Sequence, residues 1–125
     1  MLTGIDTSYF YALAAGNKIA ADTWESRELL TSVLCFHELK KRLLKGDMKA
    51  WPTILEDIAK AVEVVPVTAV AALKAGQVAH DTGMPAFDAI IMCSFAEAGC
   101  VEIITLDHHF KLFTKKGLKV TLLSR

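Results

Sequence analysis

The chain has 125 residues, which suits one domain with a single core, and its formal net charge is zero. A hydrophobic content of 53% argues against a disordered chain. No apolar run is long enough to cross a bilayer, and the N-terminus lacks the basic and apolar regions of a secretory signal. We therefore expect a single domain over residues 1–125 in a soluble, cytoplasmic protein, with its three cysteines reduced.

Short apolar, β-branched runs alternate with amphipathic stretches along the chain, a pattern typical of strands alternating with helices. The predicted strands are residues 2–5, 28–33, 62–67, 101–107 and 118–123. The predicted helices are residues 7–15, 18–25, 34–45, 48–61, 68–81 and 85–98, with a shorter one at 108–115. This alternation predicts an α/β fold in which helices flank a mostly parallel central sheet of about five strands.

The predicted helix at residues 85–98 has an unusual composition, because apolar side chains point in nearly every direction around it. Pro85 suits its first turn, and Gly99 suits the position just past its end. Asp88 is a carboxylate inside this apolar run. Burial of an unpaired carboxylate costs several kcal/mol, roughly, so Asp88 needs a capping role, a salt bridge or a metal ion.

Three further acids are placed by the predicted elements near Asp88. Asp6 ends the first strand, Glu38 lies in the helix after the second strand, and Asp107 ends the fourth strand. Each has an ordinary alternative, such as a helix cap or, for Glu38, a surface pair with Arg42. Carboxyl ends of parallel strands share one edge of the sheet, where ligands bind. Four converging carboxylates predict a site for Mg²⁺ or Mn²⁺, which can activate a water for attack on phosphorus.

Positive charges gather in two places despite the neutral total. The first group is in the helix at residues 34–45 and consists of Lys40, Lys41, Arg42 and Lys45. The second is in the C-terminal tail and includes Lys115 and Lys116. Such patches attract the phosphate backbone of nucleic acids, and a solvated helix face is the equal alternative for each.

Four short segments carry a resemblance that covers essentially the whole chain. They are Ile5-Asp6-Thr7-Ser8, His37-Glu38-Leu39, Pro85-Ala86-Phe87-Asp88-Ala89-Ile90-Ile91 and Thr105-Leu106-Asp107-His108-His109-Phe110. With these motifs in this order, the chain resembles PIN-domain nucleases, in particular small PIN proteins of the VapC toxin type.

The resemblance implies a PIN-like three-layer fold and metal-dependent endonucleolytic hydrolysis of RNA. Asp6, Glu38, Asp88 and Asp107 would be the catalytic, metal-binding acids, supported by hydroxyl hydrogen bonds from Thr7 and Thr105. The resemblance also implies a homodimer and an antitoxin protein as partners.

One position departs from the pattern of the family. Many relatives have another acid two residues after Asp107, where this chain has His109. This leaves the occupancy of a second metal site open. It also leaves room for a rival function, that of a catalytically silent PIN-fold module that binds protein or RNA partners. Zinc ligand spacing, a Gly-x-Ser-x-Gly elbow and a glycine-rich phosphate loop are all missing from the sequence.

Overall fold

A computed structural model describes residues 1–124, and Arg125, which belongs to the basic tail, lies outside the described residues. Its centre is a five-stranded sheet in the order β3-β2-β1-β4-β5, and every neighbouring pair is parallel. The strands are β1 (Leu2–Ile5), β2 (Glu28–Ser32), β3 (Glu63–Val65), β4 (Glu102–Thr105) and β5 (Lys119–Leu122). The predicted α/β class and parallel sheet are confirmed.

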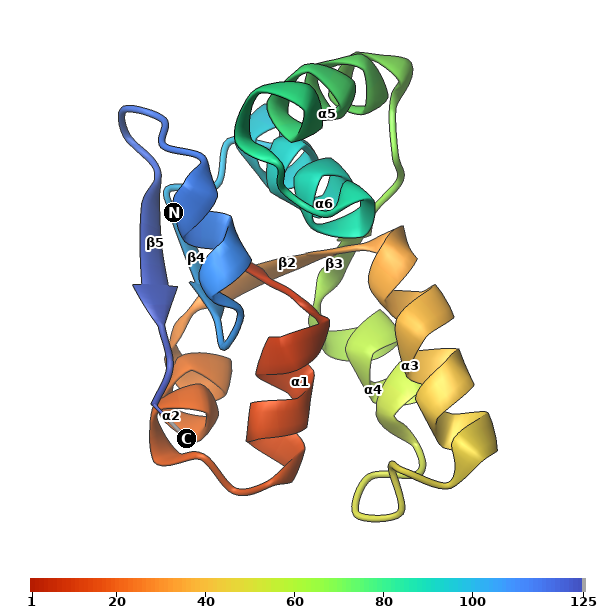
Figure 1. Ribbon diagram of the computed structural model, residues 1–125. Coiled ribbons are helices and arrows are strands. Elements are labelled where there is room, and N and C mark those ends of the chain that lie inside the picture. The colour runs from red at the N-terminus through yellow and green to blue at the C-terminus, as the bar shows by residue number, and fades with distance from the viewer. Residues whose placement is uncertain (125) are drawn as a thin grey trace.

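Six α-helices and a 3₁₀ helix complete the described part of the chain. They are α1 (Thr7–Ala14), α2 (Lys18–Ser26), α3 (Val33–Lys45), α4 (Ile54–Ala61), α5 (Ala69–Thr82), α6 (Ala86–Glu97) and η1 (His108–Leu112). Helices α5 and α6 lie on one side of the sheet, and α1, α2 and α4 lie on the other (Figure 1). The arrangement has three layers, as predicted.

Each side of the sheet has its own hydrophobic core. Phe95 and Ile91 of α6 pack with Leu30 of β2 in the first core. Phe10 of α1 packs with Ile58 of α4 in the second. Helix α6 is apolar around most of its circumference because it lies between α5 and the sheet, which explains the composition noted above.

The helix predicted at residues 48–61 is shorter than expected, because α4 spans only Ile54–Ala61. Residues 46–50 form turns instead. Pro52 disfavours helical geometry at the residue before it, so the preceding segment cannot join the helix. The segment before Pro52 is nevertheless anchored: Trp51 packs edge-on against Trp24 at 5.8 Å between ring centroids, and its Nε1 donates to Asp57 Oδ2 at 2.7 Å. Trp51 is therefore half-buried within the chain.

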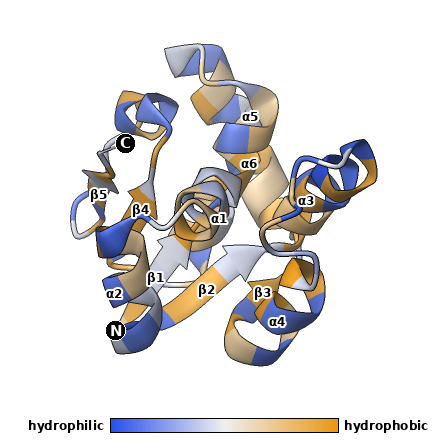
Figure 2. Cartoon of the chain, turned by 90° about the horizontal axis from the view of Figure 1, so that it is seen from below, coloured by the Kyte–Doolittle hydropathy of each residue, from blue (hydrophilic) through white to orange (hydrophobic). Residues whose placement is uncertain are grey.

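The parallel register brings polar residues to one edge of the sheet. Ile5 of β1 pairs with Ile104 of β4, so Asp6 and Thr105 follow at the same level. Strand β2 also becomes less hydrophobic along its length. Figure 2 shows it hydrophobic near its start and less so toward its carboxyl end, where Thr31 and Ser32 lie. Among the described residues, no helix has the length and apolar character needed to span a bilayer.

Candidate active site

A cavity of about 330 Å³ opens at the carboxyl ends of the central strands. All four acids predicted from the sequence line it, namely Asp6, Glu38, Asp88 and Asp107. They come from the ends of β1 and β4 and from α3 and α6, so segments far apart in the sequence meet here. Three basic side chains of α3 also line the cavity, namely Lys41, Arg42 and Lys45.

Asp6 is the most deeply buried of these acids, with only 4% of its surface exposed. It caps α1 by accepting a hydrogen bond from the Tyr9 backbone N–H at 3.1 Å. Its carboxylate also accepts from Ser8 Oγ at 2.8 Å and from Thr105 Oγ1 at 2.8 Å. Burial raises the pKa of Asp6 to about 6, although these hydrogen bonds oppose the increase. The site therefore holds a carboxylate whose charge is not fully compensated by the protein.

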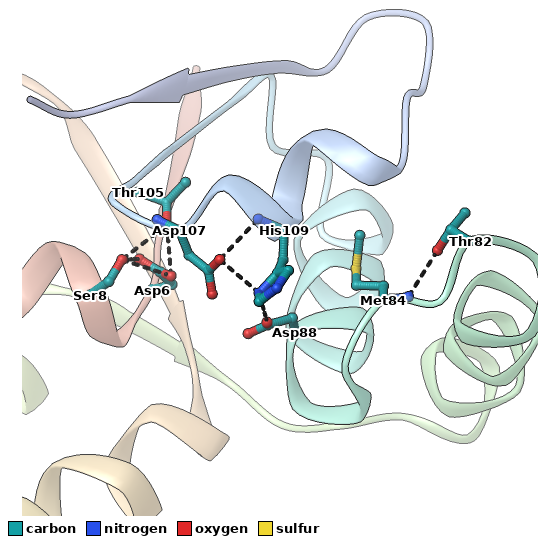
Figure 3. A network of polar contacts seen from close by, with 8 residues as sticks. All are labelled: Asp6, Ser8, Thr82, Met84, Asp88, Thr105, Asp107 and His109. Atoms are coloured by element: carbon teal, nitrogen blue, oxygen red, sulfur yellow. Dashed lines mark hydrogen bonds and ion pairs between the residues drawn. The ribbon is translucent and has the colours of Figure 1, made fainter.

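Thr105 and Ser8 tie the ends of β1 and β4 together (Figure 3). Their hydroxyl oxygens lie 3.0 Å apart. Thr105 Oγ1 accepts from the Asp107 backbone N–H at 2.9 Å, and Ser8 Oγ accepts from the Leu106 N–H at 2.9 Å. The two hydroxyls thus fix the backbone that carries Asp107 relative to Asp6.

Asp107 has a local structural role as well. It caps η1, because its Oδ1 accepts from the His109 backbone N–H at 2.9 Å. The short helix predicted at 108–115 is this 3₁₀ helix, which ends at Leu112. The cap turns the side chain of His109 back toward the carboxylates, as Figure 3 shows.

Asp88 lies in the first turn of α6, which begins directly after the short connecting turn at residues 83–85. Thr82 Oγ1 supports this turn by accepting from the Met84 N–H at 3.2 Å. Burial, together with the neighbouring charge of Asp107, raises the pKa of Asp88 to about 7. His109 opposes this increase, since its Nδ1 lies 3.3 Å from Asp88 Oδ2. An ion-pair partner for Asp88 is thus present.

Glu38 lies on the opposite wall of the cavity, in α3. Its Oε1 accepts from Thr7 Oγ1 at 2.7 Å, which links α3 to the start of α1. Arg42 pairs with Asp47 at 3.0 Å and lies over the ring of Tyr11, at 5.3 Å from its centroid. The alternative pair between Glu38 and Arg42 is not formed within the described part of the chain.

The acids are not all equally close. Single ligand atoms from Asp88, Asp107 and His109 lie within 4.8 Å of one another, whereas Asp6 and Glu38 line the cavity outside this tight group. Asp6 is joined to Asp107 through Thr105. The donors are carboxylate oxygens and one imidazole nitrogen, and this set fits a divalent cation. Such a cation would stabilise the ionised carboxylates of Asp6 and Asp88 and lower their raised pKa values.

The basic residues separate into two groups. Lys41, Arg42 and Lys45 face the cavity, while Lys40 of the same helix is exposed and does not line it. Lys115 borders a different pocket, between α5, α6 and Phe113, and Lys116 is exposed beyond it.

Sequence reasoning missed two side chains of this site. Ser8 is only part of a family motif in the sequence, yet in the structure it contacts Asp6, Thr105 and the Leu106 N–H. Its signal was its position two residues after an acid that ends a strand, where a hydroxyl can bond back to the carboxylate. His109 was noted only as a missing acid. Its contact with Asp88 depends on the 3₁₀ turn, which the sequence does not reveal.

Comparisons with known proteins agree with this arrangement. The model of the PIN domain family matches residues 5–116. The fold is similar to a structure of VapBC2 from Rickettsia felis bound to a promoter DNA fragment, with a TM-score of 0.76, 15% identity, and coverage of 99% of this chain and 100% of that chain.

Two further structures are similar. A toxin–antitoxin complex from Klebsiella pneumoniae has a TM-score of 0.73 at 15% identity, with 93% of this chain and 94% of that chain covered. VapC20 from Mycobacterium tuberculosis, described as a sarcin–ricin loop cleaving toxin, has a TM-score of 0.69 at 22% identity, with 87% of this chain and 92% of that chain covered. No curated protein sequence matches the chain significantly.

Proposed function

The chain belongs to the PIN domain family, and we propose that it is a metal-dependent endoribonuclease that hydrolyses RNA phosphodiester bonds. The observation that carries the proposal is one cavity in which four carboxylates face a basic stripe on α3. Acids alone would repel a phosphodiester. Acids beside Lys41, Arg42 and Lys45 form a place where a cation and a phosphate backbone can be held together.

Asp6, Glu38, Asp88 and Asp107 would hold Mg²⁺ or Mn²⁺. When bound, such an ion neutralises the carboxylates, activates a water and stabilises the leaving oxygen. Thr7, Ser8 and Thr105 keep the carboxylates oriented through the hydrogen bonds described above. Lys41, Arg42 and Lys45 would bind the RNA backbone, with Lys40, Lys115 and Lys116 as more distant contacts.

We further propose that the chain acts as the toxin of a toxin–antitoxin pair and forms a homodimer. Several proteins with the same fold are described as toxin–antitoxin complexes, among them those from Rickettsia felis and Klebsiella pneumoniae. The family model spans residues 5–116, which supports the proposal that residues 1–125 form one PIN-like domain. Light scattering after size-exclusion chromatography should report twice the mass of one chain, and a monomer at micromolar concentration would contradict the homodimer.

The test of the nuclease is cleavage of a mixed RNA pool with Mn²⁺, with Mg²⁺ and with EDTA. We expect cleavage with metal, none with EDTA, and none with the Asp88→Asn variant. Asp22→Asn is the matched control, because Asp22 is exposed on α2 and does not line the cavity. RNA that binds the metal-loaded protein but stays intact would contradict the nuclease and favour the silent binding module.

The fold of the variant must be checked in the same experiment. Asp88→Asn replaces a carboxylate whose ionised form is disfavoured by burial and by Asp107, so the metal-free variant should melt at the same or a higher temperature. A large decrease in melting temperature would instead assign Asp88 a structural role in α6.

A further inference from the structure

The tight group at the centre of the cavity contains a nitrogen donor where acids alone were expected. Single ligand atoms of Asp88, Asp107 and His109 lie within 4.8 Å of one another. His109 Nδ1 is 2.9 Å from Asp107 Oδ1 and 3.3 Å from Asp88 Oδ2. The ring therefore points its nitrogen between the two carboxylates (Figure 3).

His109 Nδ1 is also an unsatisfied atom. It is inaccessible to solvent and makes no hydrogen bond of acceptable geometry, even though two carboxylate oxygens are near. Buried polar atoms almost always have a partner, and a nitrogen without one is a reason to look for an absent ligand. Here the group that both carboxylates and the nitrogen can satisfy together is a cation.

The backbone at His109 is held by a hydrogen bond that does not involve the imidazole ring. Asp107 Oδ1 accepts from the backbone N–H of His109, so the cap of η1 holds the two residues together. The neighbouring ring of His108 lies 4.7 Å away between centroids, tilted by 38°. Replacement of the His109 side chain leaves the capping hydrogen bond in place, so variants at this position should fold.

We propose that His109 is a metal ligand through Nδ1, and that this nitrogen makes the site select Mn²⁺ over Mg²⁺ and bind Co²⁺ and Zn²⁺ as well. The inference rests on the proposed metal-dependent nuclease and concerns which ion that site takes. Carboxylate and water ligands suit both Mg²⁺ and Mn²⁺, but Mg²⁺ is a hard ion that takes oxygen ligands. An imidazole nitrogen adds affinity along the series that rises from Mn²⁺ through Co²⁺, so it discriminates against Mg²⁺. A site with two carboxylates and one imidazole is therefore poorly matched to Mg²⁺.

The alternative is that His109 serves only as a positively charged partner of Asp88 and Asp107. The two readings give opposite results when the side chain is removed. A ligand adds affinity for Mn²⁺, whereas an ion-pair partner competes with the metal for the same carboxylates. Removal of a ligand weakens Mn²⁺ binding, and removal of a competitor strengthens it.

The test is calorimetric titration of the full-length, metal-free protein with MnCl₂ and MgCl₂, for the wild type and for His109→Ala, His109→Asp and His108→Ala. We expect the wild type to prefer Mn²⁺, His109→Ala to lose about tenfold or more in Mn²⁺ affinity, and His109→Asp to shift the preference toward Mg²⁺. His108→Ala is the matched control, because it removes the ring beside that of His109 but none of the three ligand atoms, and it should bind much like the wild type.

Spectroscopy gives a readout that does not depend on affinity or activity. Pulsed electron paramagnetic resonance of bound Mn²⁺ should show coupling to an imidazole nitrogen in the wild type and in His108→Ala, and none in His109→Ala. Equal affinity for Mn²⁺ and Mg²⁺, unchanged or tighter Mn²⁺ binding by His109→Ala, or a missing nitrogen coupling would overturn the inference while leaving a metal-dependent nuclease intact. No binding of either ion by the wild type would overturn both.

Discussion

Thr105 connects two acids of the site through its hydroxyl group. It is completely buried, donates to Asp6 Oδ2 and accepts from the Asp107 backbone N–H. Thr105→Val keeps the shape of the side chain but removes these two hydrogen bonds and the contact with Ser8 Oγ. A buried N–H left without a partner costs about 1–3 kcal/mol, so we expect a loss of that size in urea unfolding, together with weaker metal binding in calorimetric titration.

The control for this prediction is Thr105→Ser, which retains the hydroxyl and loses only a methyl group. It should keep most of the metal affinity of the wild type. If the valine and serine variants bind metal equally well, the hydroxyl does not orient Asp6 or Asp107, and their positions must be set by backbone packing.

At this scale the sequence predicted which acids meet but not what surrounds them. Asp6 and Asp107 follow strands that any parallel arrangement brings to one edge, so their convergence is a consequence of topology. Ser8 and His109 contact the acids because of a helical turn and a 3₁₀ turn, and such local geometry is not encoded in periodicity. Thr7 and Thr105 were expected from family resemblance alone.

Helix α3 is the element that combines the acidic and basic halves of the cavity. Glu38, Lys41 and Lys45 recur at intervals of three and four residues, which puts them on one side of the helix. Lys40 is equally exposed but faces away from the cavity. We expect Lys41→Ala to weaken RNA binding and to reduce the slope of log affinity against log salt concentration by about 1, measured by fluorescence anisotropy in the Asp88→Asn background, which should leave the RNA intact.

Lys40→Ala in the same background is the matched control, since it removes the same charge from the same helix. It should change the affinity much less than Lys41→Ala does. Equal effects of the two substitutions would mean that the whole helix attracts RNA through its net charge, with no preferred face toward the cavity.

The packing of α6 on β1 makes a second prediction about an element. A Cβ atom at Gly4 would lie 2.6 Å from Phe95 Cδ2 and 2.7 Å from Cγ, and Phe95 is fully buried. Gly4→Ala must therefore push α6, which carries Asp88, away from the strand that precedes Asp6. Overpacking of this kind costs about 1–3 kcal/mol, to be measured by urea unfolding.

Gly76→Ala provides the comparison, because Gly76 is exposed inside α5 and a Cβ there would meet nothing within 4 Å. It should stabilise the protein by about 0.5–1 kcal/mol, since alanine is the better helix former. A Gly4→Ala protein as stable as the wild type would show that Phe95 can move aside without strain.

Element boundaries followed the sequence where a local signal was strong. Ser32 caps α3 by accepting from the Leu34 N–H, and Gly46 ends that helix with a left-handed backbone, and both residue types are typical of these positions. The start of α4 was misplaced because an apolar pattern continues through the turn before Pro52. Periodicity reports which side chains are buried, and the turn buries Met48 as a helix would.

For the whole molecule, the raised pKa values of Asp6 and Asp88 connect the site to stability. Their folded pKa values of about 6 and about 7 lie above the ordinary 3.8 of an unfolded chain. Between pH 4 and 7 the folded state therefore binds more protons than the unfolded state, and the free energy of unfolding falls as pH rises. The acids with lowered pKa values, such as Glu102, lose their stabilising effect only in the acid range, below this window.

We accordingly expect the metal-free protein in EDTA to be less stable at pH 8 than at pH 5. Asp88→Asn removes one of the two groups, so the decrease between these pH values should be smaller in the variant, by on the order of 2 kcal/mol. Groups that titrate in both proteins contribute equally to the two decreases, so their contributions cancel when the decreases are subtracted. Saturating Mn²⁺ should also reduce the decrease in the wild type, because an ion bound to the ionised carboxylates stabilises the folded state alone.

Urea unfolding at pH 5 and pH 8, with EDTA or with Mn²⁺, measures all of these quantities. A wild type whose stability in EDTA is constant or rises from pH 5 to pH 8 would mean that the four carboxylates are already compensated by the protein, and that the cavity has no electrostatic need for a cation. If Asp88→Asn leaves the decrease in stability unchanged, the decrease comes from Asp6 or another group. A decrease that both Mn²⁺ and the variant reduce would show that the fold stores at this edge the repulsion that metal binding relieves.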